Sequence, residues 1–195
     1  MPINDFQGDA FVAFADIGGF KAMMADGNRA AVALDVLYRA GYDVANQQQH
    51  GPANVEGLFV SDSGILFARG NGVSEIDELS SLLRAVARLN WRCFRKAVSL
   101  TTSIAFGEFS YHQRIEVPGV EKNPVYGNAY VNAFLDNEAG TPRLYTNECR
   151  IVKEGLTDGV LEWCQEDYGE LQGCLRETEN HFYFEWMRLH IDQAV

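Results

Sequence analysis

The chain is predicted to fold as an α+β domain: a ferredoxin-like, split βαβ antiparallel sheet with helices packed on one face. Three observations predict this fold. Apolar runs with strand character lie at Ala10–Ala15, at 55–68 around a turn that contains glycine, and at 100–109. Segments with helical spacing of apolar residues separate them, at 26–48 and 75–96. The resulting order β-α-β-β-α-β is the split βαβ pattern.

The two long helices carry their own start and stop signals. Asp26 or Asn28 is a candidate cap for the first helix, which is expected to end near Gln48, before Gly51-Pro52. Acidic residues begin the second helix and basic residues end it, which suits the helix dipole. The helices therefore follow from local signals as well as from periodicity.

The remaining strands and turns are read from composition. Asp62-Ser63-Gly64 is the expected hairpin turn, because glycine and aspartate favour turns between apolar runs. The alternating segment 111–117 is expected to pair with the strand at 100–109. A short helix at 127–137, a short strand at 143–146 and an aromatic strand at 181–186 are expected to follow.

Length and composition indicate a single globular unit. The 195 residues are expected to form one domain, with a core at roughly 8–147 and a C-terminal decoration at 148–195. A hydrophobic fraction of 47% is ample for a packed core, and a net charge of −11 argues against nucleic acid as a partner. The four cysteines lack metal-site spacing, and no signal peptide or membrane-length apolar stretch is evident. A cytoplasmic protein without a membrane partner is expected.

Two aspartates stand where strand-like runs end. Asp16 follows the first apolar run, and Asp62 lies at the tip of the hairpin. In the predicted sheet the first strand and the hairpin are central neighbours, so the two carboxylates are expected to meet. Paired carboxylates on adjacent strand ends are what Mg²⁺ or Mn²⁺ needs to hold a triphosphate, whereas either aspartate alone also fits an ordinary turn. The pair predicts a centre that polymerises or cyclises nucleotides.

Five segments that span roughly residues 10–145 carry a more specific signal. They are, in chain order, Phe14-x-Asp16-Ile17-x-Gly19-Phe20, Phe59-x-Ser61-Asp62-Ser63, Ser103-Ile-Ala-Phe-Gly-Glu-Phe109, Tyr126-Gly-Asn-Ala-Tyr-Val-Asn-Ala-Phe134 and Pro142-Arg143-Leu144. In these segments the chain resembles the class III nucleotidyl cyclase family. The resemblance is strongest to the pyrimidine cyclases of the Pycsar antiphage system, because their hairpin has Ser-Asp where other cyclases have Gly-Asp.

The resemblance implies a reaction and its ligands. Asp16 and Asp62 would bind two divalent ions, Mn²⁺ or Mg²⁺, with the carbonyl of Ile17 as a further ligand. The ribose 3′-oxygen would attack the α-phosphorus and release pyrophosphate, helped by positioning and charge stabilisation. Backbone N–H groups after the first strand are expected to contact the nucleotide, namely those of Ile17, Gly18, Gly19 and Phe20. The family works as a head-to-tail homodimer with active sites at the subunit interface.

Two positions depart from the pattern of purine cyclases in the family. Those enzymes read the base with a lysine four residues before the hairpin aspartate and an aspartate three residues before the helix glycine. Leu58 and Pro124 occupy these positions here, and neither makes the hydrogen bonds that read adenine or guanine. A pyrimidine is therefore expected, with UTP favoured over CTP because a donor in the pocket would bind the uracil O4.

The transition-state pair of the family also differs. Asn132 lies near the family's asparagine position, with one extra residue after Gly127, and Asp136 stands where an arginine is expected. Asn132 is a candidate catalytic residue, with a structural role as the alternative. Arg143 is the substitute candidate for contact with phosphate, with a surface or ion-pairing role as the alternative.

The leading prediction is a uridylate cyclase. It would make cyclic UMP from UTP during phage infection, and the product would activate a separate effector protein. The alternatives are a cytidylate cyclase that uses CTP, a purine cyclase with an unusual pocket, and a degenerate cyclase-like domain that binds nucleotide or a partner without turnover.

Overall fold

The computed structural model describes residues 5–46, 51–70, 72–112, 114–117, 120–122, 124–166 and 169–189. The elements in these ranges, with η for short 3-10 helices, are β1 (Phe6–Ile17), α1 (Phe20–Met23), α2 (Gly27–Asn46), β2 (Asn54–Val60), β3 (Ser63–Arg69), α3 (Glu75–Phe94), β4 (Leu100–Tyr111), β5 (Arg114–Val117), β6 (Val120–Lys122), β7 (Val125–Tyr126), α4 (Asn128–Ala139), β8 (Cys149–Val152), α5 (Asp158–Gln165), η1 (Gln172–Cys174), β9 (Leu175–Glu177), β10 (His181–Phe184) and η2 (Trp186–Arg188).

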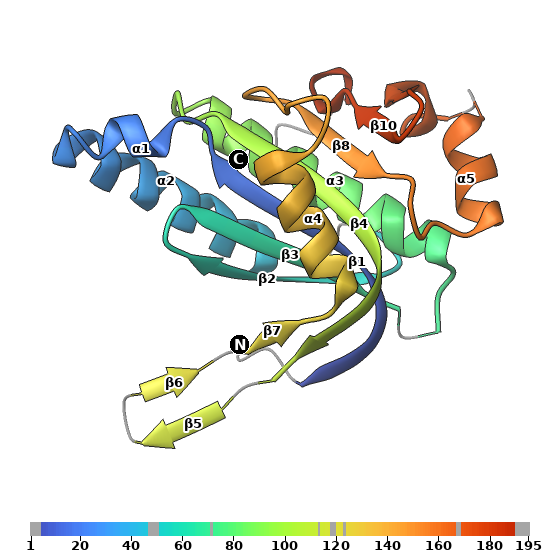
Figure 1. Cartoon of the computed structure of the whole chain (residues 1–195), viewed down its shortest axis with the longest axis horizontal. Helices are drawn as coiled ribbons and strands as arrows, with labels where there is room; N and C mark the ends of the chain where they lie inside the picture. The colour runs from blue at the N-terminus through green and yellow to red at the C-terminus, as the bar shows by residue number, and fades with distance from the viewer. Residues whose placement is uncertain are drawn as a thin grey trace.

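The strands form one large sheet in the order β2-β3-β1-β4-β8-β10-β9, with β7 paired to β4 (Figure 1). The first four strands are antiparallel, and β1 lies between β3 and β4. This order follows from two crossovers, because α2 connects β1 to β2 and α3 connects β3 to β4. The predicted split βαβ sheet is therefore confirmed.

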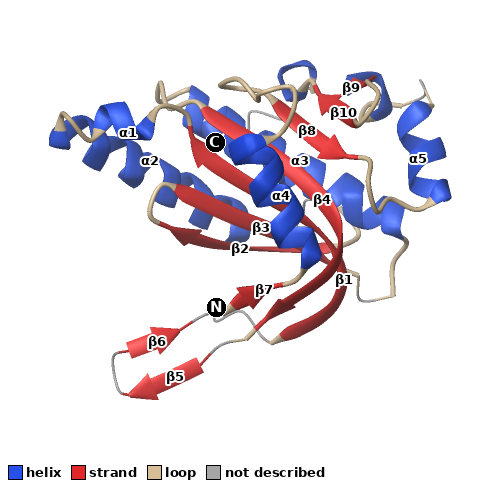
Figure 2. Ribbon diagram, viewed as in Figure 1, coloured by secondary structure: helices blue, strands red, loops and turns tan. Residues whose placement is uncertain are grey.

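The alternation of side chains along β1 divides the core between the two faces of the sheet. Phe11, Ala13 and Ala15 belong to the cluster under α2 and α3, whereas Val12 and Phe14 belong to a second cluster that includes residues of α4. Helices therefore cover both faces, and α4 crosses the face opposite α2 and α3 (Figure 2). The prediction of helices on one face holds for α2 and α3 and is wrong for α4.

Two local predictions near the middle of the chain were also wrong. The strand at 100–109 continues as β4 to Tyr111, but the following segment pairs with β6 rather than with β4. The predicted helix end near Gln48 lies outside the described residues. The strand predicted at 143–146 is a loop, and the strand is β8 at Cys149–Val152, whose buried Cys149 and Ile151 form part of the core.

The C-terminal part of the chain extends the same sheet. β8 runs parallel to β4 and pairs on its other side with β10, the aromatic strand that the sequence predicts near 181–186. The whole of β10 is buried. The division into a core and a decoration at residue 148 stays a prediction.

Two further properties concern the described ranges as a whole. All four cysteines are buried and unbridged. Nowhere in these ranges is there a helix with the length and apolar character needed to cross a bilayer.

Candidate active site

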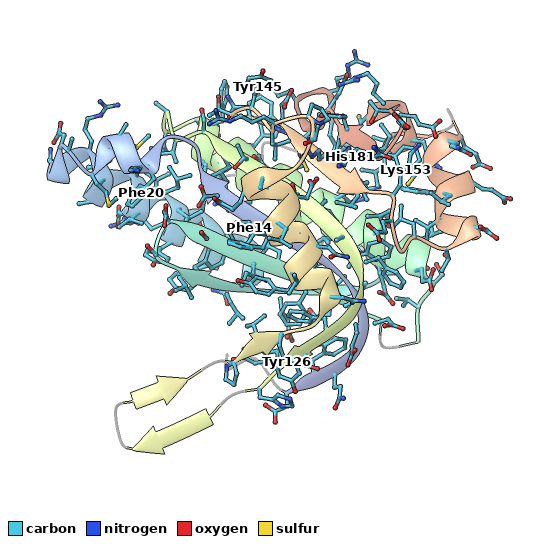
Figure 3. The ribbon with its side chains drawn as sticks, viewed as in Figure 1. Phe14, Phe20, Tyr126, Tyr145, Lys153 and His181 are labelled. Carbon is cyan, nitrogen blue, oxygen red and sulfur yellow. The ribbon has the colours of Figure 1, made fainter. Side chains whose placement is uncertain are left out.

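Asp16 lies at the end of the central strand, between two neighbours. It is opposite Ser63 of β3 and Thr101 of β4 in the register of the sheet. Side chains alternate along β1, so Asp16 lies on the same face as Phe14, which packs edge-on against Phe134 of α4. From Phe14 the chain runs to Phe20 at the start of α1 (Figure 3). The half-buried Asp16 carboxyl therefore lies between the sheet, the α4 face and this turn.

Asp62 is brought to the same place by the β2–β3 hairpin. Val60 pairs with Ser63, so the turn consists of Ser61 and Asp62, with Ser61 at φ 54°. The carbonyl of Asp62 accepts a hydrogen bond from the Ile17 N–H at 3.1 Å. The hairpin tip is thus attached to the end of β1 directly after Asp16, and the structure brings together the two aspartates that the sequence singles out.

The electrostatics of Asp16 reflect this arrangement. Burial raises the pKa of Asp16 to about 6, and the charges of Asp62 and Glu138 raise it as well. The hydroxyl of Ser63, which donates a hydrogen bond to Asp16 Oδ1 at 3.0 Å, opposes this increase. The carboxylates therefore repel one another in the protein alone, and a cation between them would relieve that repulsion.

The turn after β1 is less open to a ligand than its glycines indicate. The N–H of Ile17 is bonded to Asp62, and that of Gly18 donates to the Ser99 carbonyl at 2.9 Å. The N–H groups of Gly19 and Phe20 have no backbone partner in the part of the chain that the structure describes. Of the four predicted phosphate donors, these two are available, because the other two hold the turn in the fold.

The loop 140–148 covers this turn. A Cβ at Gly18 would overlap the methyl group of Thr146, so only glycine permits this approach. The loop is attached to the start of β4, because the Asn147 N–H donates a hydrogen bond to the Leu100 carbonyl at 2.6 Å. Arg143 is exposed on this loop and makes no hydrogen bond or ion pair with any described residue. Arg143 therefore lies on the segment that packs against the turn, and its charge is not paired with that of any described residue.

The asparagine of α4 that contacts the sheet beside Asp16 is Asn137, not the predicted Asn132. Asn132 is half-buried and has no hydrogen-bonded partner among the described side chains. Asn137, which the sequence analysis missed, accepts a hydrogen bond from Thr101 at 3.0 Å and donates one to the Phe14 carbonyl at 3.3 Å. Asn137 thus joins β1 to β4 beside Asp16. Both asparagines lie on α4, and the sequence alone does not indicate which of them faces the sheet.

Asp136, at the position where the resemblance to cyclases implies an arginine, is a structural acid whose side chain is 10% exposed. It accepts hydrogen bonds from Ser103 at 2.7 Å and from Arg150 at 2.8 and 2.9 Å, and His181 Nε2 lies 2.9 Å from it. Burial alone would raise the pKa of Asp136, but the hydrogen bonds from His181, Arg150 and Ser103 outweigh it and lower the pKa to about 2. Neither Asp136 nor Arg150 is available to a substrate.

The described residues contain no cluster of three or more acidic, histidine or cysteine side chains arranged as a complete metal site. Two carboxylates and backbone oxygens would leave the remaining positions of a divalent ion to substrate and water, as is usual for Mg²⁺ on phosphates.

Comparisons with known proteins agree on the fold. No protein-family model matches the chain, and no curated protein matches it. Among solved structures, the adenylyl cyclase CyaB from P. aeruginosa superposes with a TM-score of 0.59 at 12% identity, covering 93% of this chain and 95% of that one. The chain has the class III nucleotidyl cyclase fold.

Two guanylyl cyclase domains extend the comparison with this fold. The dimeric domain of the RhoGC fusion protein from Blastocladiella emersonii has a TM-score of 0.65 at 8% identity, with 93% of this chain and 98% of that chain covered. The domain of RhGC from Catenaria anguillulae, solved in complex with GTP, has a TM-score of 0.60 at 10% identity, with 93% and 96% covered. The cyclase fold thus spans nearly the whole chain.

Proposed function

We propose that this chain is a nucleotidyl cyclase, a lyase that converts a nucleoside triphosphate into a 3′,5′-cyclic nucleotide and pyrophosphate. The observation that carries the proposal is the attachment of the Asp62 turn to the end of β1, which places Asp62 beside Asp16 on a cyclase fold. The likeness to cyclase structures supports the reaction class, and the two carboxylates support its dependence on metal.

The donor atoms of the site fit Mn²⁺ or Mg²⁺. The carboxylates of Asp16 and Asp62 and the carbonyl of Ile17 are oxygen donors, which these ions prefer. When bound, two such ions would supply charge stabilisation to the triphosphate and acidify the ribose 3′-hydroxyl. The chain itself would orient the phosphates through the Gly19 and Phe20 N–H groups.

Neutralisation of the leaving pyrophosphate falls to the side chains around the turn. Arg143 is the candidate cation, because it is exposed on the loop over Gly18 and has no competing partner among the described residues. Asn132 remains the candidate for a polar contact with the ribose or phosphate from α4. An amide and a guanidinium can both stabilise charge that develops in the transition state.

Binding of Mn²⁺ is expected to weaken as the pH falls below 6. The Asp16 carboxyl, with a pKa near 6 against an ordinary 3.8, holds a proton that the metal must displace. In the metal-free protein, the raised pKa of Asp16 contributes to the free energy of unfolding, and this contribution is complete below pH 3.8 and is lost as the pH rises through 6. Above pH 6 the carboxyl is ionised, so metal affinity reaches its plateau there. Electron paramagnetic resonance of free Mn²⁺ should show an apparent Kd that rises about fivefold from pH 6 to pH 5 and about tenfold from pH 7 to pH 5.

Asp9→Asn is the matched control for this titration, because Asp9 is exposed on the same strand. It should keep the wild-type pH dependence. A Kd that is independent of pH between 5 and 7 in the wild type would contradict the assignment of Asp16 as a ligand.

The base is proposed to be uracil, with cytosine as the alternative. Leu58 is half-buried and packs against the apolar cluster on the α4 face of the sheet, the face that carries Asp16. Pro124 is also half-buried and lacks a donor N–H. An apolar residue and a proline at the purine-reading positions favour a smaller base that is read by other groups.

A homodimer with active sites at its interface is part of the proposal. The outer side of α4 exposes Val131, Phe134 and Leu135, each between 37% and 52% exposed, next to the exposed Tyr126 of β7. Contiguous apolar side chains of this kind mark association surfaces. A second copy that covers α4 would enclose the face on which Asp16 lies. The cyclic nucleotide is proposed to activate a separate effector protein in antiphage defence.

The experiment that tests the proposal is a competition between substrates. The purified full chain is incubated with Mn²⁺ and equal amounts of ATP, GTP, CTP and UTP, and the products are identified by mass spectrometry. Cyclic UMP is expected. Cyclic CMP would replace the base assignment, and a cyclic purine would overturn the argument from Leu58 and Pro124. The absence of product from folded dimer would favour a nucleotide-binding domain without turnover.

A further inference from the structure

Arg150 is fully buried at the centre of a polar network on the α4 face of the sheet. From β8 it donates two hydrogen bonds to the Asp136 carboxylate, one to the Asp136 carbonyl at 3.0 Å, one to the Pro142 carbonyl at 2.6 Å and one to the Tyr183 hydroxyl at 3.2 Å. One guanidinium thus holds the last turn of α4 and the loop that follows it.

The two attachments enclose a short segment that reaches the candidate active site. Between Asp136 and Pro142 lie Asn137, which joins β1 to β4, and Glu138, whose charge acts on Asp16. Directly after Pro142 comes Arg143. The groups that α4 and the loop present to the site are therefore held by a residue that does not touch it.

The fit around the guanidinium is close. A Cβ at Gly140 would overlap both Arg150 Nη2 and the Asp136 carbonyl. The planar guanidinium meets its acceptors through several fixed N–H directions, a geometry that the single ammonium of lysine does not reproduce. Replacing Arg150 by lysine keeps the charge of the network and loses its geometry.

We infer that Arg150 is a positioning residue of the active site, holding residues 136–143 so that Asn137 and Arg143 stand where the reaction needs them. The inference rests on the proposed function for the location of the site. Displacements of about 1 Å in a catalytic constellation lower rates up to a hundredfold, so loss of this geometry affects turnover more than substrate affinity.

The test compares Arg150→Lys with Arg69→Lys in the full chain. Arg69 is a matched control, since it also forms a poorly exposed ion pair, with Glu56 at 2.8 Å, and lies at the other end of β3, about 20 Å from Ser63. We expect Arg150→Lys to lower kcat about 10- to 100-fold with KM within threefold, and Arg69→Lys to stay within twofold of the wild type. Hydrogen exchange in residues 137–147 should be at least about tenfold faster in Arg150→Lys alone.

The outcomes separate the two proposals. Wild-type kcat together with unchanged exchange in Arg150→Lys overturns the positioning role. Equal losses in both variants also overturn it, because they indicate a general effect of weakened ion pairs. If Arg150→Lys does not fold, Asp136→Asn, which keeps one acceptor oxygen, takes its place with the same expectations. A wild type that turns over none of the triphosphates defeats the proposed function, whereas hydrogen exchange still decides the positioning of 137–147.

Discussion

Asp62→Asn is expected to reduce cyclic nucleotide formation about a thousandfold while the protein stays folded. The substitution removes a charged ligand at the point where the triphosphate and its ions would lie, a loss of ~4 kcal/mol of transition-state stabilisation. The fold should survive, because the contact that attaches the hairpin to β1 uses the backbone carbonyl of Asp62. Initial rates with Mn²⁺ and UTP, together with circular dichroism, measure both effects.

Asp9→Asn provides the control for this loss as well. It removes an equal charge from the same strand at an exposed position and should keep activity within about twofold, as surface substitutions usually do. An Asp62→Asn variant with at least a tenth of wild-type activity would contradict the proposal that two carboxylates form the metal site, whatever the identity of the product.

Trp186→Ala is expected to lower Tm by about 6–20 °C, corresponding to a loss of about 3–5 kcal/mol for a buried tryptophan in a chain of this length. Trp186 is 1% exposed and packs edge-on against Trp91, with ring centroids 5.6 Å apart, and against Phe94. Its indole N–H also donates to the Asn147 carbonyl at 2.8 Å. Truncation therefore leaves a cavity under α3 and an unpaired carbonyl in the loop that packs on the turn after β1.

Met187→Ala is the neighbouring control, because Met187 is 47% exposed. Differential scanning calorimetry should place its Tm within about 2 °C of the wild type. Equal Tm values for the two variants would mean that the contacts of Trp186 with α3 contribute little to the stability of the fold.

Much of the fold was predictable from local patterns. Helical spacing places α2 and α3 within a few residues of their observed bounds. The turn predicted at Asp62-Ser63-Gly64 locates the β2–β3 hairpin, although the observed turn is Ser61-Asp62 and β3 already begins at Ser63. Once these elements are ordered, the split βαβ arrangement makes β1 and β3 neighbours, because crossovers are right-handed and sequential elements pack together. The meeting of Asp16 and Asp62 therefore followed from the order of the elements.

The hydrogen-bond network around Asp136 could not be predicted from local sequence patterns. Asp136, Arg150 and His181 come from α4, β8 and β10, and no spacing along the chain relates them. β8 itself escaped prediction, since a strand of four residues with a buried arginine lacks the alternation that marks a strand. Its position beside β4 depends on a parallel pairing at long range.

The sequence by itself determined the order of the elements from β1 to β4 and the chain positions of Asp16 and Asp62 at the end of β1 and at the β2–β3 hairpin, because periodicity and turn chemistry act over a few residues. Only the tertiary structure decided which backbone N–H groups are left for a ligand, which face α4 covers, and that Asp136 binds Arg150 instead of a substrate. These features depend on contacts between distant segments, in which burial makes every unpaired polar group costly and so selects one arrangement.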